Sequence, residues 1–340
     1  MTHRDYVLAA IHHEQTDRIP YTLGFEGGTD KELDAYYGSA KWRDQVQPYL
    51  RGIAGINTTG EKPVDATHAL DRFGTLWRTD QLPAHLEKPA LSEPRAAAIK
   101  WPISADFELS RADDLATATG PQAEHFSFCW VGWGLFEQSW RIRGFAEVMM
   151  DCMLEPDFYE ELVDRVAKIY LGHVARLKDI PADAVLFGDD WGDQRGVILG
   201  PERWRRFIKP RWAEIYQAVH AQGKLVMSHS CGSVAAIMPD IIEMGMDVLE
   251  SVQPEPAGMD SFELKRKYGD KIAFWGCLGS QSTIPFGTPK QIHARVKKLC
   301  QVMGRKGGFI LAPAKSIQPG TPPANTAAVV EAFATQNLPA

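Results

Sequence analysis

The stretch that decides the fold runs Leu225-Val-Met-Ser-His-Ser-Cys-Gly232 and continues through a second apolar segment to Gly245. Its first four residues form a short apolar run that is typical of a buried strand. Residues 234–244 carry apolar side chains at helical spacing and stop at a glycine, which suits a helix end. The segment therefore predicts a strand, a polar turn and a helix in succession.

The same unit recurs through the C-terminal half of the chain, five times after residue 180. Strands that alternate with helices indicate a parallel sheet. The helix that opens at Pro201 contains Pro210, which either kinks it or splits it in two. The strands are predicted at residues 184–188, 225–228, 246–249, 272–275 and 308–312.

The N-terminal half supplies three further strands, which we predict at residues 19–25, at 53–59 and within 125–138, and an amphipathic helix at 155–180. A total of eight predicts a (β/α)8 barrel, and we expect one domain over residues 1–340. Residues 60–120 are expected to be an insertion with hairpin character. The rival is an open, Rossmann-like sheet, but no glycine-rich phosphate turn follows an early strand.

Composition narrows the class of protein. The chain has 340 residues, 44% of them hydrophobic, and a formal net charge of −6. This mildly acidic balance argues against a dedicated nucleic-acid or membrane-surface binder. The first twenty residues are polar and no long apolar run follows, so we expect a cytoplasmic protein without a membrane span. The oligomeric state is left open.

The five cysteines are too few and too widely spaced for a disulfide framework in a chain of this size. Each is therefore a buried small side chain, a metal ligand or a reactive thiol. They are Cys129, Cys152, Cys231, Cys277 and Cys300.

Several predicted strands end in a polar or thiol side chain. In a (β/α)8 barrel these ends meet at one face, where active sites of this fold lie. The alternative is that they are ordinary loop residues. The set comprises Glu26, Glu137, Gln138, Asp189, Asp190, His229, Cys231, Glu250, Gln253, Cys277, Gln281 and Lys315.

The pair His229 and Cys231 places two good zinc ligands on one tight turn. A catalytic zinc needs a third protein ligand, for which Cys277 and the carboxylate of Glu250 are the candidates. Cys277 is equally well explained as a buried thiol in the barrel core. Alternatively, Cys231 is a nucleophile paired with a base, although no third orienting group is evident.

Other residues at this face are candidates for substrate or cofactor contacts. Asp189 and Asp190 would orient the substrate or move a proton, or else cap the next loop. Lys315 either presents a cation to an anionic substrate or is solvated. We expect four further side chains to contact a substrate or cofactor, with the two tryptophans as pocket walls: Trp133, Trp191, Gln253 and Gln281.

Together these segments resemble the uroporphyrinogen decarboxylase superfamily over nearly the full chain, which implies a (β/α)8 barrel. The blocks that carry the resemblance are residues 4–20, Phe187-Gly-Asp-Asp-Trp-Gly192, His229-Ser-Cys-Gly-Ser233, Phe274-Trp-Gly-Cys277, Ile284-Pro-Phe-Gly-Thr288, Gly308-Phe-Ile-Leu-Ala-Pro313 and Pro319-Gly-Thr-Pro-Pro323.

The resemblance separates two branches of the superfamily. True uroporphyrinogen decarboxylases carry an arginine-rich N-terminal segment, but Tyr21-Thr-Leu-Gly-Phe-Glu26 contains no arginine. The chain is more similar to the cobalamin-dependent methyltransferases, which bind zinc through a His-x-Cys pair and a later cysteine. That later position here belongs to Ala312-Pro-Ala-Lys315. Either Cys277 replaces the missing ligand, or zinc is absent.

The resemblance implies a zinc-dependent methyltransferase. It would move a methyl group between a small methylated substrate or thiol and a corrinoid, carried on a corrinoid-binding partner protein. The alternative is a lyase of the uroporphyrinogen decarboxylase type that acts on a small carboxylate, with Lys315 pairing the carboxylate and an aspartate protonating the carbanion. A third possibility is a barrel that binds a small molecule without turnover.

Overall fold

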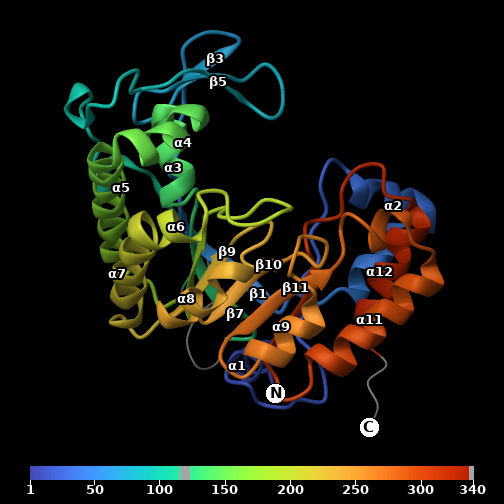
Figure 1. Cartoon of the computed structure of the whole chain (residues 1–340). Coiled ribbons are helices and arrows are strands. Elements are labelled where there is room, and N and C mark those ends of the chain that lie inside the picture. Colours follow the sequence, from blue (N-terminus) through green and yellow to red (C-terminus); the bar gives the residue numbers. More distant parts are fainter. Residues whose placement is uncertain (114, 116–122, 337–340) are drawn as a thin grey trace.

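The computed structural model describes residues 1–113, 115 and 123–336. Its centre is an eight-stranded sheet in the order β12-β11-β10-β9-β8-β7-β1-β6 with helices around it (Figure 1). All neighbours from β1 to β12 pair in parallel, and β6 alone is antiparallel. The strands are β1 (Leu50–Ile56), β6 (Leu109–Arg111), β7 (Phe126–Val131), β8 (Ala184–Gly188), β9 (Leu225–His229), β10 (Val248–Val252), β11 (Ala273–Leu278) and β12 (Phe309–Pro313). The predicted α/β class is confirmed.

Helices follow the parallel strands and pack against the outer face of the sheet. Phe187 of β8 points outward, and its ring lies 5.1 Å from Trp212 and 5.9 Å from Tyr216 between ring centroids. The helices are α1 (His3–Ile11), α2 (Thr29–Tyr37), α3 (Leu135–Arg143), α4 (Phe145–Leu154), α5 (Pro156–Arg176), α6 (Pro201–Phe207), α7 (Lys209–His220), α8 (Met238–Glu243), α9 (Ser261–Tyr268), α10 (Thr283–Phe286), α11 (Pro289–Met303) and α12 (Pro323–Thr335).

Pro210 divides the helical segment after β8. The first helix ends at Phe207 and the second begins at Lys209, one residue before the proline. A proline has no amide hydrogen to donate and is best tolerated in a first helical turn, so the split satisfies the backbone better than a kink would. Of the two outcomes that the sequence leaves open, the structure shows the split.

The first predicted strand is reduced to two parallel bridges to the last strand region, Tyr21 with Leu311 and Phe25 with Ile317. Among the described residues this segment forms no backbone ladder with β1, whose free edge pairs with β6 instead. The Tyr21 hydroxyl spans part of the gap, because it accepts a hydrogen bond from the amide of Gln47. The barrel predicted from the sequence is therefore not seen as a continuous ring of paired strands.

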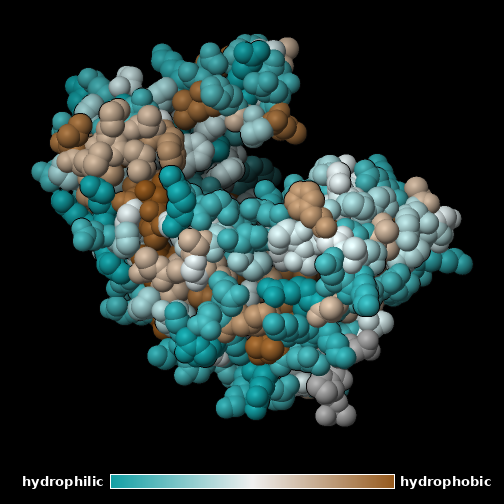
Figure 2. Space-filling model, turned by 45° about the vertical axis from the view of Figure 1, so that its right-hand side comes forward, coloured by the Kyte–Doolittle hydropathy of each residue, from teal (hydrophilic) through white to brown (hydrophobic). Residues whose placement is uncertain are grey.

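A second, antiparallel sheet has the order β2-β3-β4-β5. It lies above α3 and α4 in Figure 1 and forms one side of a deep hollow that Figure 2 shows, opposite the part that carries α2 and α12. The strands are β2 (Lys62–Pro63), β3 (His68–Leu70), β4 (Leu76–Arg78) and β5 (His85–Lys88). The division of the chain into one domain with an insertion at 60–120 stays a prediction.

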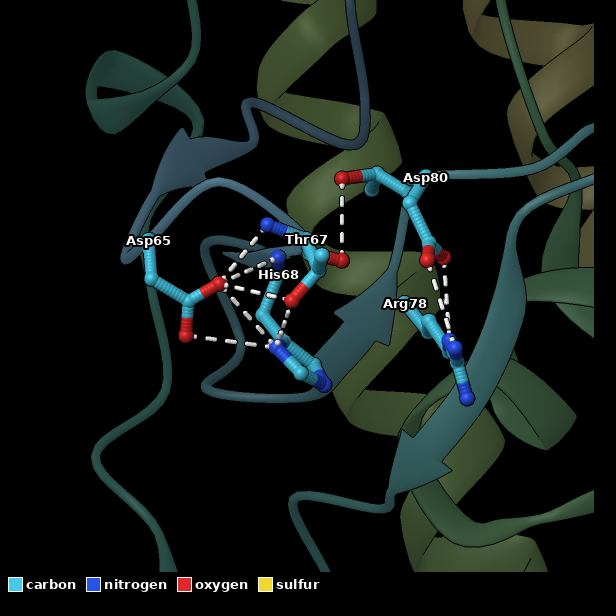
Figure 3. A network of polar contacts seen from close by, with 6 residues as sticks. Asp65, Thr67, His68, Arg78 and Asp80 are labelled. Carbon is cyan, nitrogen blue, oxygen red and sulfur yellow. Dashed lines mark hydrogen bonds and ion pairs between the residues drawn. The ribbon is translucent and has the colours of Figure 1, made fainter.

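Polar contacts order the exposed turns of this small sheet (Figure 3). The carboxylate of Asp65 accepts hydrogen bonds from the backbone amides of Thr67 and His68, and the guanidinium of Arg78 pairs with Asp80 at 2.9 Å. The Thr67 amide is the largest of the contacts that lower the pKa of Asp65 to about 2. Such exposed contacts add little stability but define the turn geometry.

Arg141 of α3 fastens the small sheet to the rest of the molecule. Its guanidinium carbon lies 4.1 Å from the ring centroid of Trp77 in β4 and 4.5 Å from that of Trp133, just after β7. Its Nη2 lies 3.3 Å from Oε1 of the Glu61 carboxylate. The cation is thus held between two indoles, an arrangement that Lys could not reproduce with its compact ammonium group.

Gln336, the last described residue, binds the backbone of Ile19 near the start of the chain. The buried side-chain amide of Gln336 accepts a hydrogen bond from the Ile19 amide at 2.9 Å and donates one to the Ile19 carbonyl at 2.7 Å. It thereby pairs both backbone groups of a residue that has no strand partner on that side. Within the described residues, no helix is both long and apolar enough to cross a membrane.

We predict that Gln336→Ala lowers the free energy of unfolding by about 2 kcal/mol, because it leaves two buried backbone groups unpaired. Thr335→Ala is the matched control, since that exposed side chain only bonds the carbonyl of Glu331, and its cost should stay below about 0.5 kcal/mol. Urea denaturation measures both. Equal effects of the two changes would contradict the role of Gln336.

Candidate metal centre

The parallel register of three strands builds the centre. Gly188 of β8 pairs with His229 of β9, and His229 pairs with Glu250 of β10. Residues in register point to the same face of a sheet, and Phe187, one residue earlier, faces the helices. His229 and Glu250 therefore both point to the inner face, at the carboxyl ends of their strands.

Two turns that follow these strands are tied together. The amide of Cys231 donates a hydrogen bond to Oδ1 of Asp190 at 2.7 Å, and the amide of Trp191 donates one to Oγ of Ser230 at 3.0 Å. Each turn thus supplies an acceptor for the other. The consequence is that a carboxylate after β8 and a thiol after β9 are held side by side.

Two glycines permit this close approach. Gly232 has a φ of +73°, and a Cβ on it would lie 2.3 Å from the carbonyl oxygen of Gly192. A Cβ on Gly192 would lie 2.6 Å from the backbone of Ser233, whose amide bonds the carbonyl of Asp193 at 2.8 Å. Any larger residue at either glycine would push the two turns apart.

Three potential ligand atoms converge at this point: Oδ1 of Asp190, Nε2 of His229 and Sγ of Cys231 lie within 4.8 Å of one another. Nε2 is 3.3 Å from the aspartate oxygen and 3.2 Å from the sulfur. The side chains of His229 and Asp190 keep 33% and 38% of their surface exposed. The group is therefore open to a solute from the inner face.

The other nitrogen of His229 is already engaged. Nδ1 lies 2.5 Å from Oε2 of Glu250, which leaves Nε2 to face the group. Burial opposes a charge on the ring, but the carboxylates of Glu250 and Asp190 outweigh it and hold the pKa of His229 well above its ordinary value. The surroundings thus favour a positive charge where the three ligand atoms meet.

This donor set fits a zinc ion. Imidazole nitrogen, thiolate sulfur and carboxylate oxygen are its usual ligands, and three protein ligands leave a position for a substrate. Ligating histidines commonly donate their second nitrogen to a carboxylate, as His229 does to Glu250. Both carboxylates and the thiolate would also offset the charge of the ion.

Asp189, next to the centre, is structural. Its carboxylate is fully buried and accepts four hydrogen bonds, which leaves no oxygen free for a substrate. Burial raises its pKa to about 6, although the four donors oppose that rise. The donors are the amides of Phe136 and Glu137 at 3.2 and 3.0 Å and the indoles of Trp191 and Trp212 at 2.7 and 2.9 Å.

Glu137 lies in the first turn of α3, where the sequence predicts only a strand end. Its side chain is 8% exposed. Burial, followed by the neighbouring carboxylates of Asp189 and Asp190, raises its pKa to about 8. The surroundings of this carboxyl group therefore favour its neutral form.

Cys277, predicted as the third ligand, is not brought to this group. Gly276 and Cys277 both have positive φ values, and the thiol of Cys277 is fully buried. Burial raises the pKa of this thiol to about 12. The structure instead brings Asp190 to the group, a residue predicted from the sequence to orient the substrate, move a proton or cap the next loop.

The remaining predicted residues are distributed around the inner face. Gln253 is buried and accepts a hydrogen bond from the amide of Gly232 at 3.1 Å, so it braces the Cys231 turn. Lys315 and Gln281 are exposed. Trp133 is 40% exposed, as a pocket wall would be, whereas Trp191 is 1% exposed and packs inside.

The profile of the family described as uroporphyrinogen decarboxylase (URO-D) matches residues 115–336. The chain belongs to the uroporphyrinogen decarboxylase family. This agrees with the resemblance seen in the sequence and with the position of the centre at the carboxyl ends of the strands.

Individual relatives include two kinds of enzyme. Methylcobamide:CoM methyltransferase MtaA of Methanosarcina barkeri is 28% identical over 177 residues, 52% of this chain and 48% of that protein. A uroporphyrinogen decarboxylase of Coxiella burnetii is 23% identical over 181 residues, 52% of this chain and 47% of that protein. The matches thus span about half the length of each relative.

The fold also matches a solved structure. A methyltransferase from Methanosarcina mazei superposes with a TM-score of 0.69 over 98% of each chain, at 18% identity. At this identity the likeness concerns the fold alone. It supports the α/β arrangement described above.

We predict that Asp189→Ala lowers the free energy of unfolding by at least about 3 kcal/mol, because four buried N–H groups lose their acceptor. The control is Asp193→Ala, which removes an exposed carboxylate that bonds the amides of Arg195 and Gly196. That change should cost far less. Unfolding curves in urea measure both, and a similar midpoint for the two variants would argue against the structural role of Asp189.

Proposed function

We propose that this protein is a zinc-dependent methyltransferase. It would transfer a methyl group between a thiol, or a small methylated substrate, and a corrinoid carried by a partner protein. The observation that supports the proposal most is the convergence of Asp190, His229 and Cys231 on one point of the inner face. The relation to a methylcobamide:CoM methyltransferase supports the choice of chemistry.

Each residue of the centre has a separate proposed role. Asp190, His229 and Cys231 would hold the ion, and Glu250 would fix the orientation of the imidazole through Nδ1. When bound, zinc would act as a Lewis acid that lowers the pKa of a ligated thiol, so that a thiolate forms at neutral pH. The buried carboxyl group of Glu137 would supply a proton to the demethylated substrate when the exchange runs in the opposite direction.

The overall exchange is balanced without a further reactant. The thiol would lose its proton to solvent, its sulfur would form a bond to the methyl carbon, and the bond between that carbon and the cobalt of the carrier would break. The electron pair of the broken bond stays on the cobalt. In the opposite direction a methylated substrate gives its methyl group to the reduced corrinoid.

The lyase alternative receives less support from the geometry. It needs an aspartate that reaches a carbanion and a cation that pairs with the substrate carboxylate. The carboxylate of Asp189 is bound by four protein donors away from the centre. Only Asp190 of this pair lies beside His229 and could reach a substrate there. Lys315 is exposed after β12, with no described contact that holds it toward the centre.

We predict about one zinc per purified chain, with the metal content measured by mass spectrometry. Asp190→Asn and Cys231→Ser should each lower the zinc content strongly, because each removes one of three ligands. Cys277→Ser changes a buried thiol outside the group and should leave one zinc in place. Loss of zinc from the Cys277 variant with retention in the Cys231 variant would refute this assignment.

We also predict turnover of methylcobalamin with a thiol such as coenzyme M, followed by the absorbance change of the corrinoid. Zinc removal by a chelator should abolish the reaction, and added zinc should restore it. Cys231→Ser should be inactive. A zinc-loaded wild-type protein that leaves methylcobalamin unchanged, yet releases carbon dioxide from a small carboxylate, would favour the lyase.

A further inference from the structure

Trp130 is an exposed indole in the middle of a buried strand. It is 41% exposed, whereas its neighbours Cys129 and Val131 are 0% and 1% exposed. Side chains alternate along a strand, so Trp130 points to the opposite face from these two core residues. A large apolar ring in contact with water at such a position needs an explanation.

The strand register shows that this face is the one that carries the metal centre. Trp130 pairs with Leu186 of β8, and Leu186 pairs with Met227 of β9. His229 stands two residues beyond Met227 and therefore shares its face. From strand spacing and rise, Trp130 and His229 are separated by about 10 Å across two strands and about 7 Å along them.

Glycines make room for the indole. A Cβ on Gly55, its partner in β1, would lie 2.1 Å from Nε1 of Trp130, and a Cβ on Gly132 would lie 2.9 Å from Cζ3. The ring therefore lies directly over the backbone at both places. The ring lies against the backbone at two glycines on one side and keeps its exposed surface on the other.

A second indole stands beside the first. Trp133 is 40% exposed, has a φ of +29°, and is backed by the guanidinium of Arg141 at 4.5 Å from its ring centroid. A non-glycine residue in this region of φ costs conformational energy, which is often seen at ligand sites. Two tryptophans thus border the same end of β7 with open ring surface.

We propose that Trp130 is a stacking platform for a planar aromatic ring of the substrate, on the same face of the sheet as the metal centre. The proposal rests on the proposed function and narrows its substrate class to molecules in which a ring carries the reacting group. An aliphatic thiol would cover the indole but gain no ring stacking. A cationic substrate is disfavoured, because Arg141 already places a positive charge on the neighbouring indole.

The test compares two thiols of equal carbon skeleton, phenylmethanethiol and cyclohexylmethanethiol, which differ in whether the ring is planar. Calorimetry measures the dissociation constant of each for the zinc-loaded wild type, Trp130→Leu and Trp130→Phe. Trp130→Leu should weaken phenylmethanethiol by roughly 3- to 10-fold and cyclohexylmethanethiol by less than about 2-fold. Trp130→Phe should keep most of the preference for the planar ring.

The zinc content of each variant shows that the fold and the centre are intact. Equal weakening of both thiols by Trp130→Leu would overturn the platform and leave the proposed function standing. Failure of both thiols to bind the zinc-loaded wild type would overturn the proposed function and the platform with it. Loss of preference in Trp130→Phe as complete as in Trp130→Leu would likewise contradict stacking.

Discussion

The parallel register of β8, β9 and β10 is the constraint on which the site depends. It aligns Gly188, His229 and Glu250 in one row, so the imidazole meets a carboxylate without any contribution from a loop. Because the strands end together, the turns that follow β8 and β9 also meet. Gly192 and Gly232 allow backbone contact there, and the ligand atoms of Asp190 and Cys231 arrive next to the imidazole as a result.

Adjacent aspartates show how one segment serves both stability and chemistry. Asp189 points toward the helices, where two indoles and the start of α3 donate four hydrogen bonds to its carboxylate. Asp190 points the other way and keeps 38% of its side chain exposed beside His229. The first carboxylate fixes α3 and the second completes the centre. Successive residues leaving a strand point in opposite directions, which separates the two tasks.

The alternation of strands and helices was readable from the sequence because apolar runs, glycines and prolines mark each unit. The α/β class follows from it, whereas the family is indicated by the residue blocks that resemble it. The ring closure did not follow, because the segment at Tyr21 contacts β12 by isolated bridges and binds residues before β1 through its hydroxyl. Such side-chain contacts leave no periodic signal in a sequence.

The site was predictable in part. The pair His229 and Cys231 stood out by type and spacing, and Glu250 was recognised as a candidate third ligand. The structure places Glu250 on the far nitrogen of the ring instead, and Asp190 in the ligand position. Deciding between them requires the strand register, and the orientation of Cys277 depends on two positive φ values that residue types alone do not reveal.

The most direct test of the centre is the zinc-edge X-ray absorption spectrum of the metal-loaded protein. The account predicts one sulfur at about 2.3 Å and nitrogen or oxygen ligands at about 2.0–2.2 Å, unchanged in Cys277→Ser. A spectrum with two sulfur ligands, or with none, would contradict the assignment of Asp190, His229 and Cys231.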